Sequence, residues 1–232
     1  MSEKPLPRIN AVVLFLLLSL LSKLALADMA PDKMLEVTTQ DMISALQNQH
    51  QAIQQDHRVL YGLIKNILLP HIDIIASSRM VLGKYWRRAS ENQKLRFIRA
   101  FRDLLVRFYS SALAEYLSDH TIHSNFITFL PLRGSLEQKR LTVRAEIHPP
   151  RGEKVALSYR MRHTAKGWKV YDVTVAGISI ISTYRTSFAS EIRQKGLEPF
   201  IESIEKHNQA LLHAVKIRAA RALQSPLKQA AD

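Results

Sequence analysis

The spacing of apolar residues changes twice along the chain, and these changes decide the fold class. Between residues 38 and 117 apolar side chains recur every three or four positions, which is typical of amphipathic helices. From Leu141 apolar and polar side chains alternate, which is typical of strands with one buried face. Helical spacing returns after Ser182. Because helices and strands are segregated along the chain, the sequence predicts an α+β fold.

The strand region predicts a meander. Residues 141–147 and 155–161 alternate on either side of a turn at Pro149-Pro150-Arg151-Gly152, and a third strand covers residues 168–175. A shorter strand is expected at residues 126–130. Short turns join consecutive antiparallel neighbours. We therefore expect a curved antiparallel sheet of about four strands packed against a helical layer.

The longest predicted helix covers about residues 91–117. Ser90 followed by Gln93 forms a capping box, which marks the start of a helix. The apolar stripe of this helix is wider than one core-facing side requires. Other helices, a sheet or a ligand must therefore cover most of its circumference, and the residues alone leave these possibilities open.

The amino end has the pattern of an export signal. Lys4 and Arg8 precede an apolar run from Ala11 to Leu21, and Ala25-Leu26-Ala27 provides the small residues of a cleavage site. The alternative is a membrane anchor, but this run of 11 residues would cross only about half of a hydrocarbon layer about 30 Å thick. We expect residues 1–27 to be removed and the mature protein to reside in the periplasm.

Composition narrows the function classes further. The sequence contains no cysteine, which excludes disulfides and thiol catalysis and disfavours zinc sites. The net charge of +13 becomes +11 when Glu3, Lys4, Arg8 and Lys23 leave with the signal. Export removes nucleic acid as a partner. The positive charge then faces anionic lipid headgroups or acidic proteins, or maintains solubility.

Catalytic signatures are absent from the sequence. The glycines occur singly, and neither a G-x-S-x-G elbow nor an H-E-x-x-H motif is present. We predict no catalytic residues, no metal site and no enzymatic activity. Asp172 lies within an apolar strand and needs a partner if it is buried. Arg185 in the following helix is the predicted partner in a structural ion pair.

Several motifs occur together in one order. They are Leu69-Pro70-His71-Ile72-Asp73, Val81-Leu82-Gly83-Lys84-Tyr85-Trp86-Arg87, Gly167-Trp168-Lys169-Val170-Tyr171-Asp172-Val173 and Tyr184-Arg185. Over residues 35–207 the chain resembles the MlaC family, also called the toluene-tolerance auxiliary family. Members of this family are periplasmic phospholipid-binding proteins of the pathway that maintains lipid asymmetry.

The resemblance implies a fold, a cargo and partners. It implies an apolar cavity between sheet and helices that holds acyl chains, with the headgroup near the mouth. It also implies shuttling between an outer-membrane lipoprotein–porin complex and an inner-membrane ABC transporter that carries an MCE domain. We expect phospholipid as cargo, no cofactor, transient membrane contact and a monomer.

The resemblance also divides the chain. Residues 28–207 form the expected lipid-binding domain, and residues 208–232 add a basic C-terminal helical extension and tail. At Ile72 and Ile74 the chain has isoleucine where the family usually has phenylalanine, a difference that can reshape the cavity wall.

The expected cavity lies between the long helix and the dry face of the meander. On the helix the expected wall residues are Phe101, Leu105, Phe108, Tyr109 and Ala112. On the strands they are Val143, Ala145, Ile147, Val155, Leu157, Tyr159, Tyr171, Val173 and Val175. Each of these side chains also fits an ordinary core.

Three alternatives to a phospholipid carrier stay open. The first is a carrier of another membrane lipid, such as a hopanoid. The second is a hydrolase on the same fold. The third is an adaptor that docks membrane complexes through the basic C-terminal helix, which carries Lys216, Arg218 and Arg221.

Overall fold

The structure is a computed structural model that describes residues 29–120, 122–150 and 152–208. The predicted signal peptide, residues 1–27, lies outside the described residues. So does the extension at 208–232, apart from Asn208. Among the helices of the described ranges, none combines the length and apolarity needed to span a membrane.

One antiparallel sheet of five strands follows the chain in the order β1-β2-β3-β4-β5. The strands are β1 Ile127–Phe129, β2 Arg140–Ile147, β3 Val155–Thr164, β4 Gly167–Val175 and β5 Ile178–Ser179. The meander and the short first strand are confirmed. β5 was not predicted, because two residues are too few to show alternation.

A two-residue turn joins β4 to β5. Ala176 and Gly177 both have positive φ, +49° and +82°, which is the backbone of a type I′ hairpin turn. Alanine is strained in this region whereas glycine is not. Through this turn and β5 the chain passes from β4 into helix α7.

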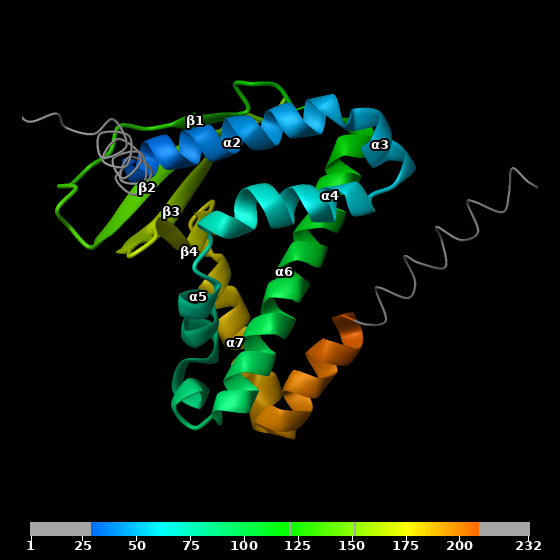
Figure 1. Ribbon diagram of the computed structural model, residues 1–232, viewed down its shortest axis with the longest axis vertical. Coiled ribbons are helices and arrows are strands. Elements are labelled where there is room, and N and C mark those ends of the chain that lie inside the picture. Colours follow the sequence, from blue (N-terminus) through cyan, green and yellow to red (C-terminus); the bar gives the residue numbers. More distant parts are fainter. Residues whose placement is uncertain (1–28, 121, 151, 209–232) are drawn as a thin grey trace, which may run out of the picture.

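The helices precede and follow the sheet. They are α2 Pro31–Asn48, α3 His50–Gln55, α4 Arg58–Leu63, the π-helix η1 Ile64–Leu68, the 3₁₀ turn η2 Leu69–His71, α5 Ile74–Leu82, the 3₁₀ segment η3 Gly83–Arg87, α6 Glu91–Asp119, α7 Ile180–Lys195 and a last helix at residues 197–208. Figure 1 shows α2 lying across β1 and β2, while α6 runs the length of the molecule.

Local signals explain where these helices begin. The predicted capping box of α6 is confirmed, since Ser90 Oγ accepts from Gln93 N at 3.2 Å and Gln93 Oε1 accepts from Ser90 N at 3.0 Å. Asp73 caps α5 by accepting from Ala76 N at 2.9 Å. α2 begins at Pro31, before residue 38, where the helical spacing in the sequence begins, because proline suits the first helical turn.

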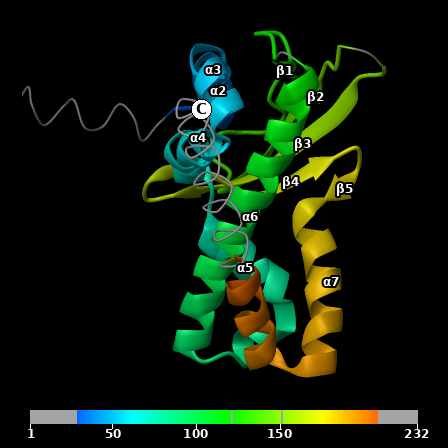
Figure 2. The same ribbon diagram turned by 90° about the vertical axis from the view of Figure 1, so that its right-hand side faces the viewer.

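α6 takes part in two separate cores. Near its start, Phe97 and Phe101 pack with Phe188 of α7 and with Phe200. Figure 2 shows α7 running beside this lower half of α6. Near its end, Ala114 and Leu117 pack with α2 and α4 in a second cluster. Both ends of α6 are therefore anchored, and its middle faces the sheet.

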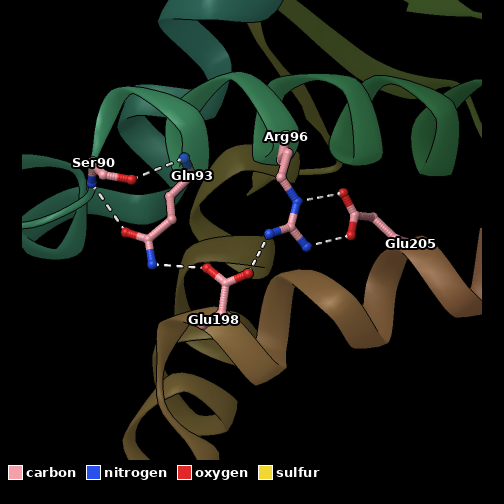
Figure 3. A network of polar contacts seen from close by, with 5 residues as sticks. All are labelled: Ser90, Gln93, Arg96, Glu198 and Glu205. Carbon is pink, nitrogen blue, oxygen red and sulfur yellow. Dashed lines mark hydrogen bonds and ion pairs between the residues drawn. The ribbon is translucent and has the colours of Figure 1, made fainter.

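A polar network ties the start of α6 to the helix at 197–208 (Figure 3). Arg96 pairs with Glu205 through Nε–Oε1 at 3.0 Å and Nη2–Oε2 at 2.6 Å, and it also pairs with Glu198. Gln93 Nε2 donates to Glu198 Oε2 at 2.9 Å. Hydrogen bonds from Gln93 and Arg96 lower the pKa of Glu198.

Replacing Arg96 with methionine is expected to reduce the free energy of unfolding by about 1 kcal/mol at pH 7, the size of a partly exposed ion-pair network. Because the pKa of Glu198 is lowered in the folded state, its stabilisation is present above the ordinary pKa of 4.5. It is lost as the pH falls through the folded-state value. The difference between wild type and variant should therefore be smaller at an acidic pH well below 4.5 than at pH 7. Denaturant unfolding at both pH values measures it, with Arg99→Met as the charge-matched control on the same helix. An equal effect of both substitutions would contradict the assigned role of the network.

Candidate functional site

A cavity of about 520 Å³ lies between the middle of α6 and β4. Its volume is within the range of small-molecule sites. The lining residues are Ile64, Leu68, Leu69, Ile72, Ile74, Ser77, Arg102, Leu105, Val106, Tyr109, Ala112, Leu113, Tyr159, Val170, Tyr171, Asp172, Val173, Val175, Ile180 and Ile181. Nearly all of this surface is hydrocarbon, so the space favours an apolar occupant over water.

The helical wall comes from one stripe of α6. Leu105, Tyr109 and Ala112 recur at the spacing that brings side chains onto one face of a helix. Because the two ends of α6 are packed into separate cores, this middle stretch does not close onto the sheet. The space that remains is the cavity.

The opposite wall is β4, with β3 beside it. Tyr159 of β3 pairs with Val173, and Leu157 pairs with Val175. A bulge between Arg160 and Met161 shifts the register, since Arg160 is opposite Asp172 and Met161 is opposite Val170. The extra β4 residue is Tyr171. Bulges redirect side chains at such points, and both Tyr171 and the residue before it reach the cavity.

The polar groups of this wall are directed into the protein. Asp172 Oδ2 accepts from Ser179 Oγ at 2.8 Å, and its Oδ1 accepts from Ile181 N at 3.2 Å. Ser77 Oγ donates to the carbonyl of Tyr171 at 2.8 Å. Because these groups already have hydrogen-bond partners within the protein, an apolar occupant of the cavity does not leave them unsatisfied.

The predicted ion pair between Asp172 and Arg185 is not formed. Asp172 Oδ2 lies 3.6 Å from Nη1 of Arg160, its cross-strand neighbour on β3. Arg185 Nε instead donates to the carbonyl of Met80 at 2.7 Å and so joins α7 to α5. The register of the sheet places Arg160 opposite Asp172. Register at a bulge cannot be read from the alternation of apolar and polar residues in a strand.

Tyr159 and Tyr109 of the cavity wall are uncharged at neutral pH. Burial raises the pKa of Tyr159 to about 12. Burial, with a smaller contribution from the neighbouring Tyr184, also raises the pKa of Tyr109 to about 12. Their phenols add hydrogen-bonding capacity without adding charge to the wall.

The structure brings half of the predicted cavity residues together. Seven line the cavity: Leu105, Tyr109, Ala112, Tyr159, Tyr171, Val173 and Val175. Phe101 lies instead in the core with Phe97 and Phe188, and the Phe108 side chain is 59% exposed. Phe101 lies one turn before Leu105 on the same face of α6, where Tyr184 and Phe188 of α7 cover it, so its position along the helix keeps it out of the cavity.

The other five predicted residues lie elsewhere on the sheet. Val143 is fully buried against α2, where Met34 and Leu35 cover it. Ala145 and Leu157 are buried outside the cavity lining, and Ile147 and Val155 are half-buried where β2 pairs with the start of β3. Because α2 already covers the β1–β2 side of the sheet, the cavity is confined to the β3–β4 side.

Of a further wall of the cavity, sequence reasoning named only Ile72 and Ile74 and missed the rest. Ile64, Leu68 and Leu69 reach the cavity from the η1 and η2 segments, Ile72 reaches it from the link after η2, and Ile74 is the first residue of α5. The two isoleucines are the positions where the chain departs from the usual family residues. A π-helical turn such as η1 shifts the helical phase, so a 3.6-residue pattern does not identify the residues on its inner face.

Within the described residues no three His, Asp or Glu side chains are grouped in a way that could hold a metal ion. The charged residues of the cavity lining are Arg102 and Asp172.

The fold and the cavity define a class: an α+β protein whose antiparallel sheet and long central helix enclose an apolar cavity. The family described as MlaC protein matches residues 36–206. The chain therefore belongs to the MlaC family, as its sequence motifs predicted.

Known proteins similar to the chain cover most of its length. The intermembrane phospholipid transport system binding protein MlaC of Haemophilus influenzae is 24% identical over 190 residues, covering 81% of this chain and 86% of that protein. The toluene tolerance protein ttg2D of Pseudomonas putida is 27% identical over 184 residues, covering 79% and 82%.

A solved structure has the same fold. The phospholipid-binding protein of Ralstonia solanacearum, determined in complex with a phospholipid, superposes with a TM-score of 0.70. The two chains are 22% identical, and the match covers 79% of this chain and 99% of that one.

Proposed function

We propose that this protein is a phospholipid carrier that moves lipid between membranes. The observation that carries the proposal is the cavity of about 520 Å³, whose wall is apolar and whose Asp172 and Ser77 side chains already have partners within the protein. The names of the relatives support phospholipid as the cargo.

The energetics of such a carrier require no catalytic residue. Each methylene group kept from water contributes about 0.8 kcal/mol. A bilayer provides the same shielding as the cavity, so exchange between them is close to thermoneutral while release into water is strongly unfavourable. The direction of transfer must then come from partner proteins.

The proposal extends to location and partners. After removal of residues 1–27, the domain at residues 28–207 would work in the periplasm as a monomer with transient membrane contact. Its partners would be an outer-membrane lipoprotein–porin complex and an inner-membrane ABC transporter with an MCE domain, and their joint task would be to maintain outer-membrane lipid asymmetry. The carrier would need no cofactor beyond its cargo.

Native mass spectrometry of protein purified from cells tests the cargo. We expect an adduct with the mass of a phospholipid, which lipid extraction should release intact. A hopanoid adduct in its place would contradict the assigned cargo, and the protein would then be a carrier of another membrane lipid. A protein that carries no lipid and turns over an ester substrate would overturn the proposal in favour of a hydrolase.

The adaptor alternative has its own readout. Deleting residues 209–232 should leave lipid content unchanged if the cavity performs the function. The adaptor would be favoured if the full chain carried no lipid and the shortened variant no longer bound membrane complexes.

A further inference from the structure

One cation lies on the wall of the apolar cavity. Arg102 belongs to the same stripe of α6 as Leu105 and Tyr109, and its side chain is 41% exposed. The other charged lining residue, Asp172, is buried and its carboxylate is held by Ser179 and the backbone of Ile181. Arg102 is therefore the charged residue of the described lining whose side chain is exposed to solvent.

The local partner of Arg102 leaves much of its guanidinium available. Asp103, the next residue, accepts from Nε at 2.9 Å and lies 2.8 Å from Nη2, both through the single atom Oδ1. An arginine has five N–H donors. Within the described residues these are the contacts that the guanidinium makes. An ion pair in which both side chains are exposed to solvent is also weak.

Polarity changes along the cavity from this point. Between Arg102 and Leu113 the helix advances about 16 Å at about 1.5 Å per residue. The cavity residues of α6 beyond Arg102 are apolar or are the uncharged Tyr109. A cation at one end of a hydrocarbon-lined space matches an amphiphile with an anionic head and an apolar tail.

We propose that Arg102 binds the phosphodiester of the cargo lipid at the rim of the cavity, an inference that rests on the proposed function. Guanidinium pairs with phosphate through charge-assisted, bidentate hydrogen bonds. The carrier thereby distinguishes a phospholipid from a neutral lipid with the same acyl chains. Asp103 competes with the phosphate for the same guanidinium and so weakens lipid binding.

The test compares two lipids with identical acyl chains, phosphatidylglycerol and diacylglycerol, bound to delipidated protein. In Arg102→Met the affinity for phosphatidylglycerol should fall about tenfold or more, as expected when a charge-assisted hydrogen bond is lost. The affinity for diacylglycerol should stay unchanged. Asp103→Asn should shift phosphatidylglycerol binding the opposite way, and the Arg99→Met control should match wild type.

The outcomes separate this inference from the function on which it rests. Wild-type protein that binds neither lipid would overturn the proposed function. Wild-type protein that binds both lipids, with Arg102→Met affecting neither or both equally, would overturn only the role of Arg102. Inorganic phosphate should not displace bound phosphatidylglycerol, because the tails hold the lipid. Displacement at modest concentrations would identify a free-phosphate site instead and would also overturn the role of Arg102 in lipid binding.

Discussion

Aspartate in place of Val173 is expected to lower phospholipid binding by about 100-fold or more. Val173 lines the cavity from β4, opposite Tyr159. A carboxylate there must either be buried without a partner or take up a proton, and both cost several kcal/mol. Each 1.4 kcal/mol corresponds to about a tenfold change in affinity. Native mass spectrometry of purified protein should show the lipid adduct disappear.

The neighbouring residue offers a matched control. Thr174 pairs with Ser158, so its side chain lies on the other face of the sheet. Thr174→Asp introduces the same charge one position along the strand, and we expect it to retain lipid. Should Val173→Asp fail to fold, Ala112→Phe fills the cavity from α6 without adding charge and should exclude lipid as well. Lipid retained by both folded cavity variants would show that the cargo lies elsewhere.

Truncating Phe101 to alanine is expected to lower the free energy of unfolding by about 3–5 kcal/mol, the range for a buried phenylalanine. Its side chain is fully buried. It stacks on Phe97 with ring centres 5.6 Å apart and meets Tyr184 edge-on at 5.4 Å. Denaturant unfolding measures the loss, and the folded fraction should still carry lipid because Phe101 is not part of the cavity wall.

Phe108 provides the comparison, because Phe108→Ala is the same chemical change at a side chain that is 59% exposed. Its effect on stability should stay below about 1 kcal/mol, as for most surface substitutions. Similar losses for the two variants would contradict the packing described for α6. Loss of lipid in Phe101→Ala without loss of stability would return Phe101 to the cavity wall, where the sequence had placed it.

Local signals were sufficient for most of the secondary structure. The alternation in β2 and β3 identified paired strands, and the capping box at Ser90 marked the start of α6. These predictions succeeded because their physical causes act within a few residues of each other. The helical spacing was recognised only from residue 38, although Thr38 lies inside α2, where its Oγ1 donates to the carbonyl of Met34 at 2.7 Å.

The candidate site was only half predictable, because a cavity wall depends on what lies opposite each residue. The pattern of α6 showed a broad apolar surface and could not separate Phe101, which packs into the core, from Leu105, which lines the cavity. Val143 has the alternation of a wall residue, yet α2 covers it.

The sequence by itself determined the fold class, the main strands and caps, and membership of the MlaC family, because periodicity and motifs are written within short stretches of chain. Only the tertiary structure decided which apolar faces meet and which remain apart. It placed α2 over one side of the sheet, anchored both ends of α6, and paired Asp172 with Arg160 at a bulge. The cavity exists because both ends of α6 are packed into cores while its middle does not close onto the sheet, and these contacts arise between elements far apart in the sequence.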